Sequence, residues 1–277
     1  MNHKLKFVLG IVLITMAFTV LVAGCTSSPT VSPTPTAMPK TDLTVFAAAS
    51  LGGAFNETKA AYEAQHNDVN VVFNFDGTQN LRAQVEQGAR ADVFAAASTS
   101  HMNALKNESY MNNSTIGNFA NNKLAVIVPK DNKANITSLA DLAKPGVKIV
   151  IGTKDVPVGG YATQIMEKMG NNSTYGKDYQ TAVMNNIASR ETTVNYVVSK
   201  VALGEADAGF VYVSDVPAEY KDKVTAIPIP DSLNVIAVYP IGVLKDAKSP
   251  AAAQGFVDFV RSADGKAILA KYGFTPV

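Results

Sequence analysis

The apolar positions of this chain form short runs that alternate with helix-like stretches from residue 41 to the C-terminus. Short runs of β-branched, aromatic and small residues predict strands, and apolar residues three or four positions apart predict helices. Strands are predicted at 43–49, 69–75, 91–97, 124–130, 147–152, 208–213, 224–228 and 234–244. Helices are predicted around 53–65, 79–88, 99–106, 138–142, 160–169, 178–187, 193–203 and 249–269. This alternation predicts parallel sheets in an α/β fold, with ligands at the carboxyl ends of the strands.

Several turns from strand to helix carry residues suited to holding an anion. Ser50 ends the first apolar run, and a helical pattern begins directly behind it, so we expect Ser50 to be the N-cap of that helix. Similar turns occur at Thr78, after Pro157 and near Val194. A helix N-terminus has unpaired N–H groups and the positive end of the helix dipole. Because right-handed crossovers bring such turns to one edge of a sheet, the sequence predicts an anion cradle.

The candidate contacts differ in the chemistry they offer. Thr78 could cap its helix or present its hydroxyl to a ligand. The segment VPVGGY, which includes Val158, is apolar and is expected to be a loop that offers only backbone N–H groups. Val194 opens an amphipathic helix, and Tyr212 ends a strand with a phenol that can donate one hydrogen bond. Ordinary capping and core packing would account for each of these residues taken singly.

The N-terminus has the pattern of a secretory lipoprotein signal. Two lysines precede the apolar run 7–23, whose end forms the sequence LVAGC together with Gly24 and Cys25. We expect cleavage after residue 24 and lipidation of Cys25, with an uncleaved membrane helix as the alternative. Residues 25–40 are rich in Ser, Thr and Pro, so they are expected to be an extended tether between the anchor and the folded body. Both interpretations place the body outside the cytoplasm, attached to the cell membrane.

Charge and composition exclude several classes of function. Without residues 1–24 the chain has 22 basic and 23 acidic residues, a formal charge of −1, and no basic stripe, which argues against nucleic acid as a partner. Cys25 is the only cysteine, so an internal disulfide is impossible. Only His66 and His101 remain after cleavage, which excludes a Cys/His metal site and makes a Ser-His-Asp triad hard to assemble. No GxSxG or Walker A motif is present.

Seven stretches between residue 43 and the C-terminus form a specific combination. They are VFAAASL (45–51), FDGT (75–78), QVEQGARADVFAAAS (84–98), VPVGGYA (156–162), VALGEADAGFVYVSD (201–215), VYP (238–240) and KYGFT (271–275). Taken together, these stretches resemble the substrate-binding lipoproteins of molybdate ABC transporters, and the resemblance runs from residue 43 to the C-terminus.

The resemblance implies an α/β fold of the class II periplasmic-binding-protein type. Its two lobes would comprise residues 41–121 with 240–277 and residues 122–239, and the ligand would lie in the cleft between them. The family holds a tetrahedral dianion with neutral donors. Carried over to this sequence, the donors are the hydroxyls of Ser50, Thr78 and Tyr212 and the backbone N–H groups of Ser50, Thr78, Val158 and Val194. The family has serine at the position of Thr78 and alanine at that of Val158, so both changes could narrow the pocket.

The function implied is capture of molybdate, and of the nearly identical tungstate, for an ABC permease driven by its ATPase. The protein would be a monomeric receptor without a cofactor or a free metal cation, and the metal would enter only as the oxyanion. Asp155 and Glu191 leave open a six-coordinate centre completed by carboxylates, as in related archaeal-type proteins, although surface acids are the simpler interpretation. The other hypotheses are a receptor for sulfate or another tetrahedral anion, a surface hydrolase with Ser50 as nucleophile, and a structural or adhesive lipoprotein.

Overall fold

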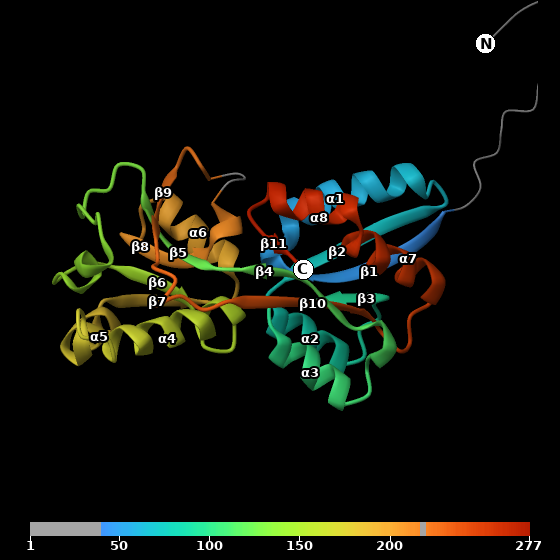
Figure 1. Cartoon of the computed structure of the whole chain (residues 1–277), viewed down its shortest axis with the longest axis horizontal. Helices are drawn as coiled ribbons and strands as arrows, with labels where there is room; N and C mark the ends of the chain where they lie inside the picture. The colour runs from blue at the N-terminus through green and yellow to red at the C-terminus, as the bar shows by residue number, and fades with distance from the viewer. Residues whose placement is uncertain (1–39, 217–219) are drawn as a thin grey trace, which may run out of the picture. The chain divides into compact units, whose positions relative to one another are not determined.

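The computed structural model describes residues 40–216 and 220–277 (Figure 1). The predicted signal peptide at 1–24, the lipidation site Cys25 and the tether up to residue 39 lie outside the described residues. Within the described part of the chain, no helix has both the length and the apolar character needed to cross a membrane.

The first sheet has six strands in the order β11-β4-β10-β3-β1-β2. Strands β1, β2 and β3 are parallel, whereas β10 is antiparallel to β3 and β4, and β11 is antiparallel to β4. The strands are β1 (Thr41–Ala48), β2 (Val69–Asp76), β3 (Val93–Ala95), β4 (Gly117–Asn122), β10 (Ala237–Val243) and β11 (Thr275–Pro276). We call this sheet and the helices packed on it the first lobe.

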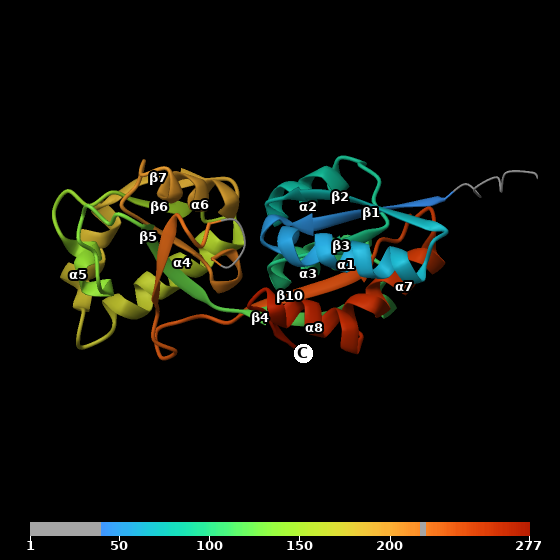
Figure 2. The same ribbon diagram turned by 90° about the horizontal axis from the view of Figure 1, so that it is seen from above.

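Helices cover both faces of the first sheet, as Figure 1 shows; Figure 2 shows the same helices from above. Helices α1 (Gly52–Gln65), α7 (Pro250–Arg261) and α8 (Ala263–Lys271) pack together on one face. Helices α2 (Thr78–Glu86) and α3 (Thr99–Asn107) pack together against β1 and β10 on the other. Phe55 of α1 is fully buried, with its ring 5.9 Å from that of Phe119 on β4 and 6.0 Å from that of Phe256 on α7. These aromatic contacts fix the helical layer on the sheet.

The second lobe is built on a five-stranded sheet in the order β7-β6-β8-β5-β9. Strands β6, β7 and β8 are parallel, and β5 is antiparallel to β8 and β9. Every residue of the central strands β5, β6 and β8 is buried, as expected for strands covered on both faces. The strands are β5 (Leu124–Pro129), β6 (Ile149–Gly152), β7 (Ile187–Glu191), β8 (Ala208–Tyr212) and β9 (Val224–Pro228). The helices are α4 (Pro157–Gly170), α5 (Gly176–Asn185) and α6 (Val194–Ala202).

Two segments connect the lobes. Strand β4 of the first sheet leads through Lys123 into β5 of the second, and the chain returns from β9 into β10. The predicted lobe boundaries, after residues 121 and 239, therefore fall inside β4 and β10. The assignment of residues to lobes at that precision stays a prediction.

The structure corrects several predicted elements. Both sheets are mixed rather than parallel, because β10 and β5 enter their sheets from the connecting segments and run antiparallel to their neighbours. Strands β4, β7 and β11 are missing from the prediction: β4 and β7 are rich in polar residues, and β11 has only two residues. The long C-terminal helix is two helices, which meet at Ser262 in an extended conformation. The predicted helix at 138–142 is a 3₁₀ helix at Leu139–Ala143.

Candidate functional site

A small cavity lies where the carboxyl ends of parallel strands from both lobes meet. Three segments of the first lobe reach it after β1, β2 and β3, and three of the second lobe reach it at the ends of β6, β7 and β8. Its volume is about 20 Å³. The lining residues are Ala48, Ala49, Ser50, Gly77, Thr78, Ala97, Val156, Pro157, Val158, Val194 and Tyr212. All five residues predicted to contact a ligand are among them.

Ser50 is not the N-cap that the sequence pattern predicts. It lies in a 3₁₀ turn at Ala49–Leu51, and the N-cap of α1 is Leu51. The Ser50 side chain is buried, and its Oγ is 3.0 Å from Oη of Tyr239 on β10. When the Tyr239 hydroxyl donates this hydrogen bond, the proton of the Ser50 hydroxyl stays free for a ligand.

Thr78 is the first residue of α2, whose N-cap is Gly77. Its buried Oγ1 accepts a hydrogen bond of 3.2 Å from the backbone N–H of Ala97. One acceptor lone pair of this hydroxyl is thus used within the first lobe, while its proton remains available as a donor. Both hydroxyls of the first lobe thus have a hydrogen-bond partner within that lobe.

Val158 and Val194 lie in the first turns of two helices of the second lobe. Helix α4 begins at Pro157, so the predicted loop VPVGGY is mostly the first turn of a helix, since proline is favoured at that position. Val194 is the first residue of α6 and follows the N-cap Thr193, whose Oγ1 accepts from the Tyr196 N–H. Because the first N–H groups of a helix have no partner within it, both residues offer backbone donors at the positive end of a helix dipole.

Tyr212 ends β8, and only 2% of its surface is exposed. Its hydroxyl has no hydrogen-bond partner among residues 40–216 and 220–277. Burial, reinforced by the nearby Tyr239, raises the pKa of Tyr212 well above its usual value, so the phenol keeps its proton. A buried hydroxyl without a partner costs about 1–3 kcal/mol. An acceptor bound in the cavity would remove that cost.

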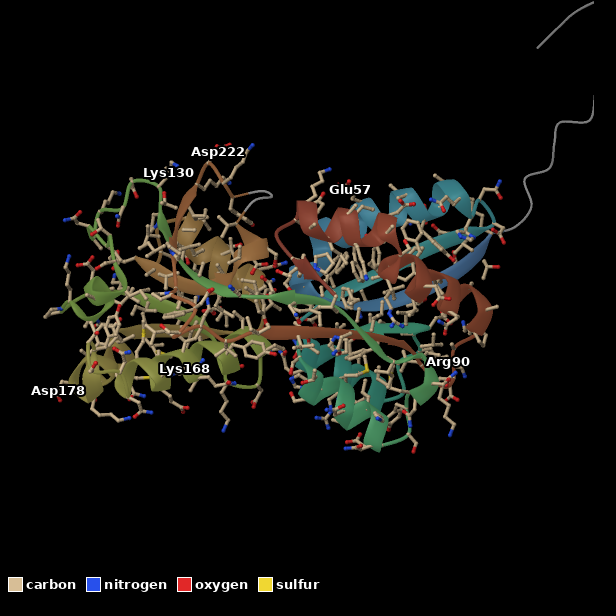
Figure 3. The ribbon with its side chains drawn as sticks, in the orientation of Figure 1. Glu57, Arg90, Lys130, Lys168, Asp178 and Asp222 are labelled. Carbon is tan, nitrogen blue, oxygen red and sulfur yellow. The ribbon has the colours of Figure 1, made fainter. Side chains whose placement is uncertain are left out.

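The cavity wall carries no charged side chain among the described residues. Charged groups such as those labelled in Figure 3 lie around the outside of the lobes in that view. Asp215 lies three residues after Tyr212 in the sequence, and its Oδ2 accepts a hydrogen bond of 2.9 Å from the Tyr212 N–H. Burial raises the pKa of the Asp215 carboxyl to about 8, although that hydrogen bond opposes the shift. The carboxyl is therefore mostly neutral at pH 7.

Neither acid considered for a six-coordinate centre lines the cavity. The Asp155 residue is exposed, and Glu191 pairs with Lys200, its Oε1 2.6 Å from Nζ. In the described part of the chain, no group of three or more His, Cys, Asp or Glu side chains is placed to hold a metal ion.

Several residues that support and surround this site carry no signal in the sequence. Tyr239 belongs to the matching stretch VYP, but the pattern gave no reason to pair it with Ser50, 189 positions earlier. Gln79, His101 and Tyr161 cross from one lobe to the other beside the cavity. The sequence offered no signal for these contacts, because they depend on how the lobes meet.

A two-lobed α/β fold with a site between the lobes defines a binding protein of the periplasmic type. Residues 43–275 match the family model described as bacterial extracellular solute-binding protein, and the chain belongs to that family. The molybdate-binding protein ModA of Mycobacterium tuberculosis (strain ATCC 25618 / H37Rv) is 37% identical over 254 residues, which cover 92% of each chain.

Two solved structures share the fold. The periplasmic molybdate-binding protein of Azotobacter vinelandii has a TM-score of 0.72 at 21% identity, covering 84% of this chain and 98% of that one. The sulfate-binding protein SubI of Mycobacterium tuberculosis H37Rv has a TM-score of 0.76 at 19% identity, covering 86% and 87%. The predicted class II periplasmic-binding-protein fold is confirmed.

Proposed function

We propose that this protein captures molybdate, and tungstate with it, outside the cytoplasm and delivers it to an ABC import permease. The observation that carries the proposal is the gathering of Ser50, Thr78, Val158, Val194 and Tyr212 around one small, uncharged cavity. The similarity to the mycobacterial molybdate-binding protein supports molybdate as the ligand.

The donor chemistry of the cavity suits a fully ionised tetrahedral dianion. Such an ion accepts hydrogen bonds at every oxygen and has no proton of its own to place. The hydroxyls of Ser50 and Thr78 each carry a proton that can be donated to such an ion, and the Tyr212 phenol is protonated. Protonated phosphate needs a hydrogen-bond acceptor for its own proton. The cavity wall is a poor source of acceptors, so we expect phosphate to be rejected.

The size of the cavity favours a small inorganic ion over an organic solute. At about 20 Å³ the cavity is far smaller than the roughly 300–1,000 Å³ typical of sites for larger organic ligands. Sulfate has the same shape and charge as molybdate but shorter bonds from the central atom to oxygen. We expect the spacing of the donors to favour the larger ion, with sulfate as the second candidate because a sulfate-binding protein shares the fold.

The contacts of Ser50 favour a receptor over a hydrolase. Its Oγ is hydrogen-bonded to the hydroxyl of Tyr239, whose pKa burial raises well above the usual value. A phenol that keeps its proton is a poor general base for activating Ser50. We accordingly propose a binding protein without enzymatic activity.

We also propose how the receptor is held at the cell surface. Lipidation at Cys25 after removal of residues 1–24 would anchor a monomeric receptor, and the tether 25–40 would let the body reach the permease and its ATPase. Mass spectrometry of the membrane-bound protein tests this directly: a diacylglyceryl group on Cys25 supports the anchor, and an intact residue 1–24 segment contradicts it.

Isothermal titration of the full chain in detergent with molybdate, tungstate and sulfate tests the proposed ligand. We expect one-to-one binding of molybdate and tungstate, with sulfate at least about 100-fold weaker, which corresponds to about 2.7 kcal/mol. Tighter binding of sulfate would replace molybdate with sulfate as the ligand. No heat from any of the three with folded, ligand-free protein would refute the oxyanion receptor.

A further inference from the structure

Three side chains form hydrogen bonds from one lobe to the other beside the cavity. Gln79 Nε2 on α2 donates to the carbonyl oxygen of Thr192 at 2.8 Å, and Tyr161 Oη on α4 donates to the carbonyl oxygen of Ala97 at 3.3 Å. His101 Nε2 on α3 lies 3.1 Å from the carbonyl oxygen of Asp155. Since a carbonyl oxygen only accepts, His101 Nε2 carries the proton in this contact.

These bonds end on the same segments that supply the proposed ligand donors. Ala97 lines the cavity, Thr192 lies two residues before Val194, and Asp155 directly precedes the lining residue Val156. The three side chains themselves do not line the cavity. They therefore position the walls without touching an anion held between them.

We propose that Gln79, His101 and Tyr161 form a latch between the lobes that sets how tightly and how long the closed cleft holds its anion. The inference rests on the proposed binding of an oxyanion in that cleft. Each latch bond exists only while the lobes are together, so its free energy adds to the closed, ligand-holding state and to no other. An anion that contacts both walls of the cavity also binds only when the lobes are together. Its affinity therefore depends on the latch bonds.

The latch is incomplete, which keeps the empty protein from being held shut. Oε1 of Gln79 and Nδ1 of His101 are buried and have no hydrogen-bond partner among the described residues. Both atoms give up a hydrogen bond with water when the lobes meet, and this loss offsets part of the gain from the bond on the other atom of the same side chain. The closed state then needs the bound anion for the rest of its stability. The lobes can therefore open again and release the anion.

His101 also makes the latch sensitive to pH. A proton on Nδ1 would place a charged, unpartnered N–H in the closed interface, and burial lowers the pKa of His101, opposed by its bond to the Asp155 carbonyl. The charged groups that act on the ring are Arg82 and Glu86 of α2 and Asp155 of the facing loop. Acid therefore favours the open state, in which the imidazolium is hydrated, and the affinity for the anion falls as the pH drops below about 6.5, the usual pKa of histidine.

The test measures molybdate affinity of the full chain in detergent by isothermal titration. The variants are Gln79→Ala, Tyr161→Phe and His101→Ala, and Asn103→Ala on the exposed face of α3 is the matched control. We expect each latch variant to weaken binding about fivefold to tenfold, in line with one hydrogen bond, and the triple variant about 100-fold or more. The control should bind like the parent, and the melting temperature of the anion-free latch variants should match that of the parent.

Two results would overturn the latch. Latch variants that bind molybdate as tightly as the parent would show that closure does not depend on these bonds. Variants that melt earlier without anion, in proportion to their loss of affinity, would show a purely structural role. Absence of binding by the parent would instead refute the proposed function, so the two failures are distinguishable.

A pH series separates the histidine from the rest of the latch. His101→Gln keeps an amide donor for the Asp155 carbonyl but does not titrate. Between pH 7.5 and 5.5 we expect the affinity of the parent to fall severalfold and that of His101→Gln to stay level, so protonation of the anion itself is controlled for. Parallel profiles for the two proteins would overturn the role of His101 in the pH response.

Discussion

The two walls of the cavity present their donors in different ways. On the first-lobe wall, the hydroxyls of Ser50 and Thr78 each have a hydrogen-bond partner inside their own lobe, Tyr239 and the Ala97 N–H. On the second-lobe wall, Val158 and Val194 offer backbone N–H groups, and Tyr212 has a buried hydroxyl without a partner. The first wall is thus complete before a ligand arrives, while the second becomes complete only with one.

This difference separates stability from binding. Removing a first-wall hydroxyl should disturb both the lobe and the ligand, because the hydroxyl serves both. Removing the Tyr212 hydroxyl should disturb the ligand alone. Substitutions at the two walls test this contrast. The first of them places a side chain between the walls.

The largest effect is expected from Gly77→Ala. A Cβ at Gly77 would lie 2.5 Å from the backbone carbonyl oxygen of Thr192 in the other lobe. This clash can be relieved only if the lobes move apart. We expect a loss of molybdate affinity of more than about 100-fold, measured by isothermal titration, with little change in the melting temperature of the anion-free protein. Gly159→Ala is the contrasting variant, because its Cβ would clash at 2.1 Å with the Thr153 carbonyl inside the second lobe and should lower the melting temperature. Near-parent affinity of Gly77→Ala would show that the walls need not approach this closely.

Tyr212→Phe is expected to have the next largest effect. It deletes the unpartnered hydroxyl, which we propose donates to a charged acceptor, a bond worth about 1.5–3 kcal/mol or roughly 10- to 100-fold in affinity. The anion-free protein should be as stable as the parent or slightly more stable, since a buried unsatisfied group is removed. Loss of stability together with unchanged affinity would contradict the assignment of Tyr212 to the ligand.

Ser50→Ala should affect binding and stability together. It removes one donor to the ligand and leaves the hydroxyl of the buried Tyr239 without the partner it has at 3.0 Å. We expect about tenfold weaker binding and a free energy of unfolding lower by about 1–2 kcal/mol in urea titrations of the anion-free protein. The double variant Ser50→Ala with Tyr239→Phe should recover part of the stability but none of the affinity. Recovery of the affinity would show that Ser50 does not donate to the anion.

A smaller effect is expected from raising the pH above 8. The pKa of Asp215, about 8, is above its unfolded value, so the carboxyl is neutral in the folded protein below pH 8. The neutral carboxyl of Asp215 stabilises the folded protein fully below the unfolded pKa, and this stabilisation is lost as the pH rises through 8. The new negative charge beside Tyr212 then repels a bound anion. Molybdate affinity should fall severalfold from pH 7 to pH 9 in the parent and stay level in Asp215→Asn. A decline of equal size in both proteins would assign it to other groups.

The smallest effect on binding is expected from Val158→Ala. The side chain is apolar, and only the backbone N–H is proposed to reach the ligand, so affinity should change less than about threefold, below 1 kcal/mol. The loss of buried methyl groups should still lower the melting temperature, because Val158 is 1% exposed. A large loss of affinity in a protein that remains folded would mean that the side chain itself shapes the cavity.

Sequence patterns predicted the buried strands well and the polar ones poorly. The wholly apolar β5 and β8 were predicted to within a residue or so, because burial on both faces leaves an uninterrupted apolar run. Strand β4, with the sequence GNFANN, was missed because its pairing with β10 is set by the fold around it. For the same reason the alternation of strands and helices indicated the α/β class but not the antiparallel strands in each sheet.

The candidate site was predicted from turn positions together with the resemblance to a family, and the structure shows the contacts that these residues make. Local periodicity and turn chemistry, which depend on neighbours in the chain, indicated that Ser50, Thr78 and Val194 lie at turns from strand to helix and that Tyr212 ends a strand. The segment with Val158 was expected to be a loop, and the resemblance singled out the five residues as ligand contacts. The sequence could not determine that Ser50 pairs with Tyr239, or that Gln79, His101 and Tyr161 cross between the lobes. Those features arise from contacts between residues tens to nearly two hundred positions apart. Only the tertiary structure, by packing two separate sheets against one cavity, decided which donors keep a partner of their own and which remain free for a ligand.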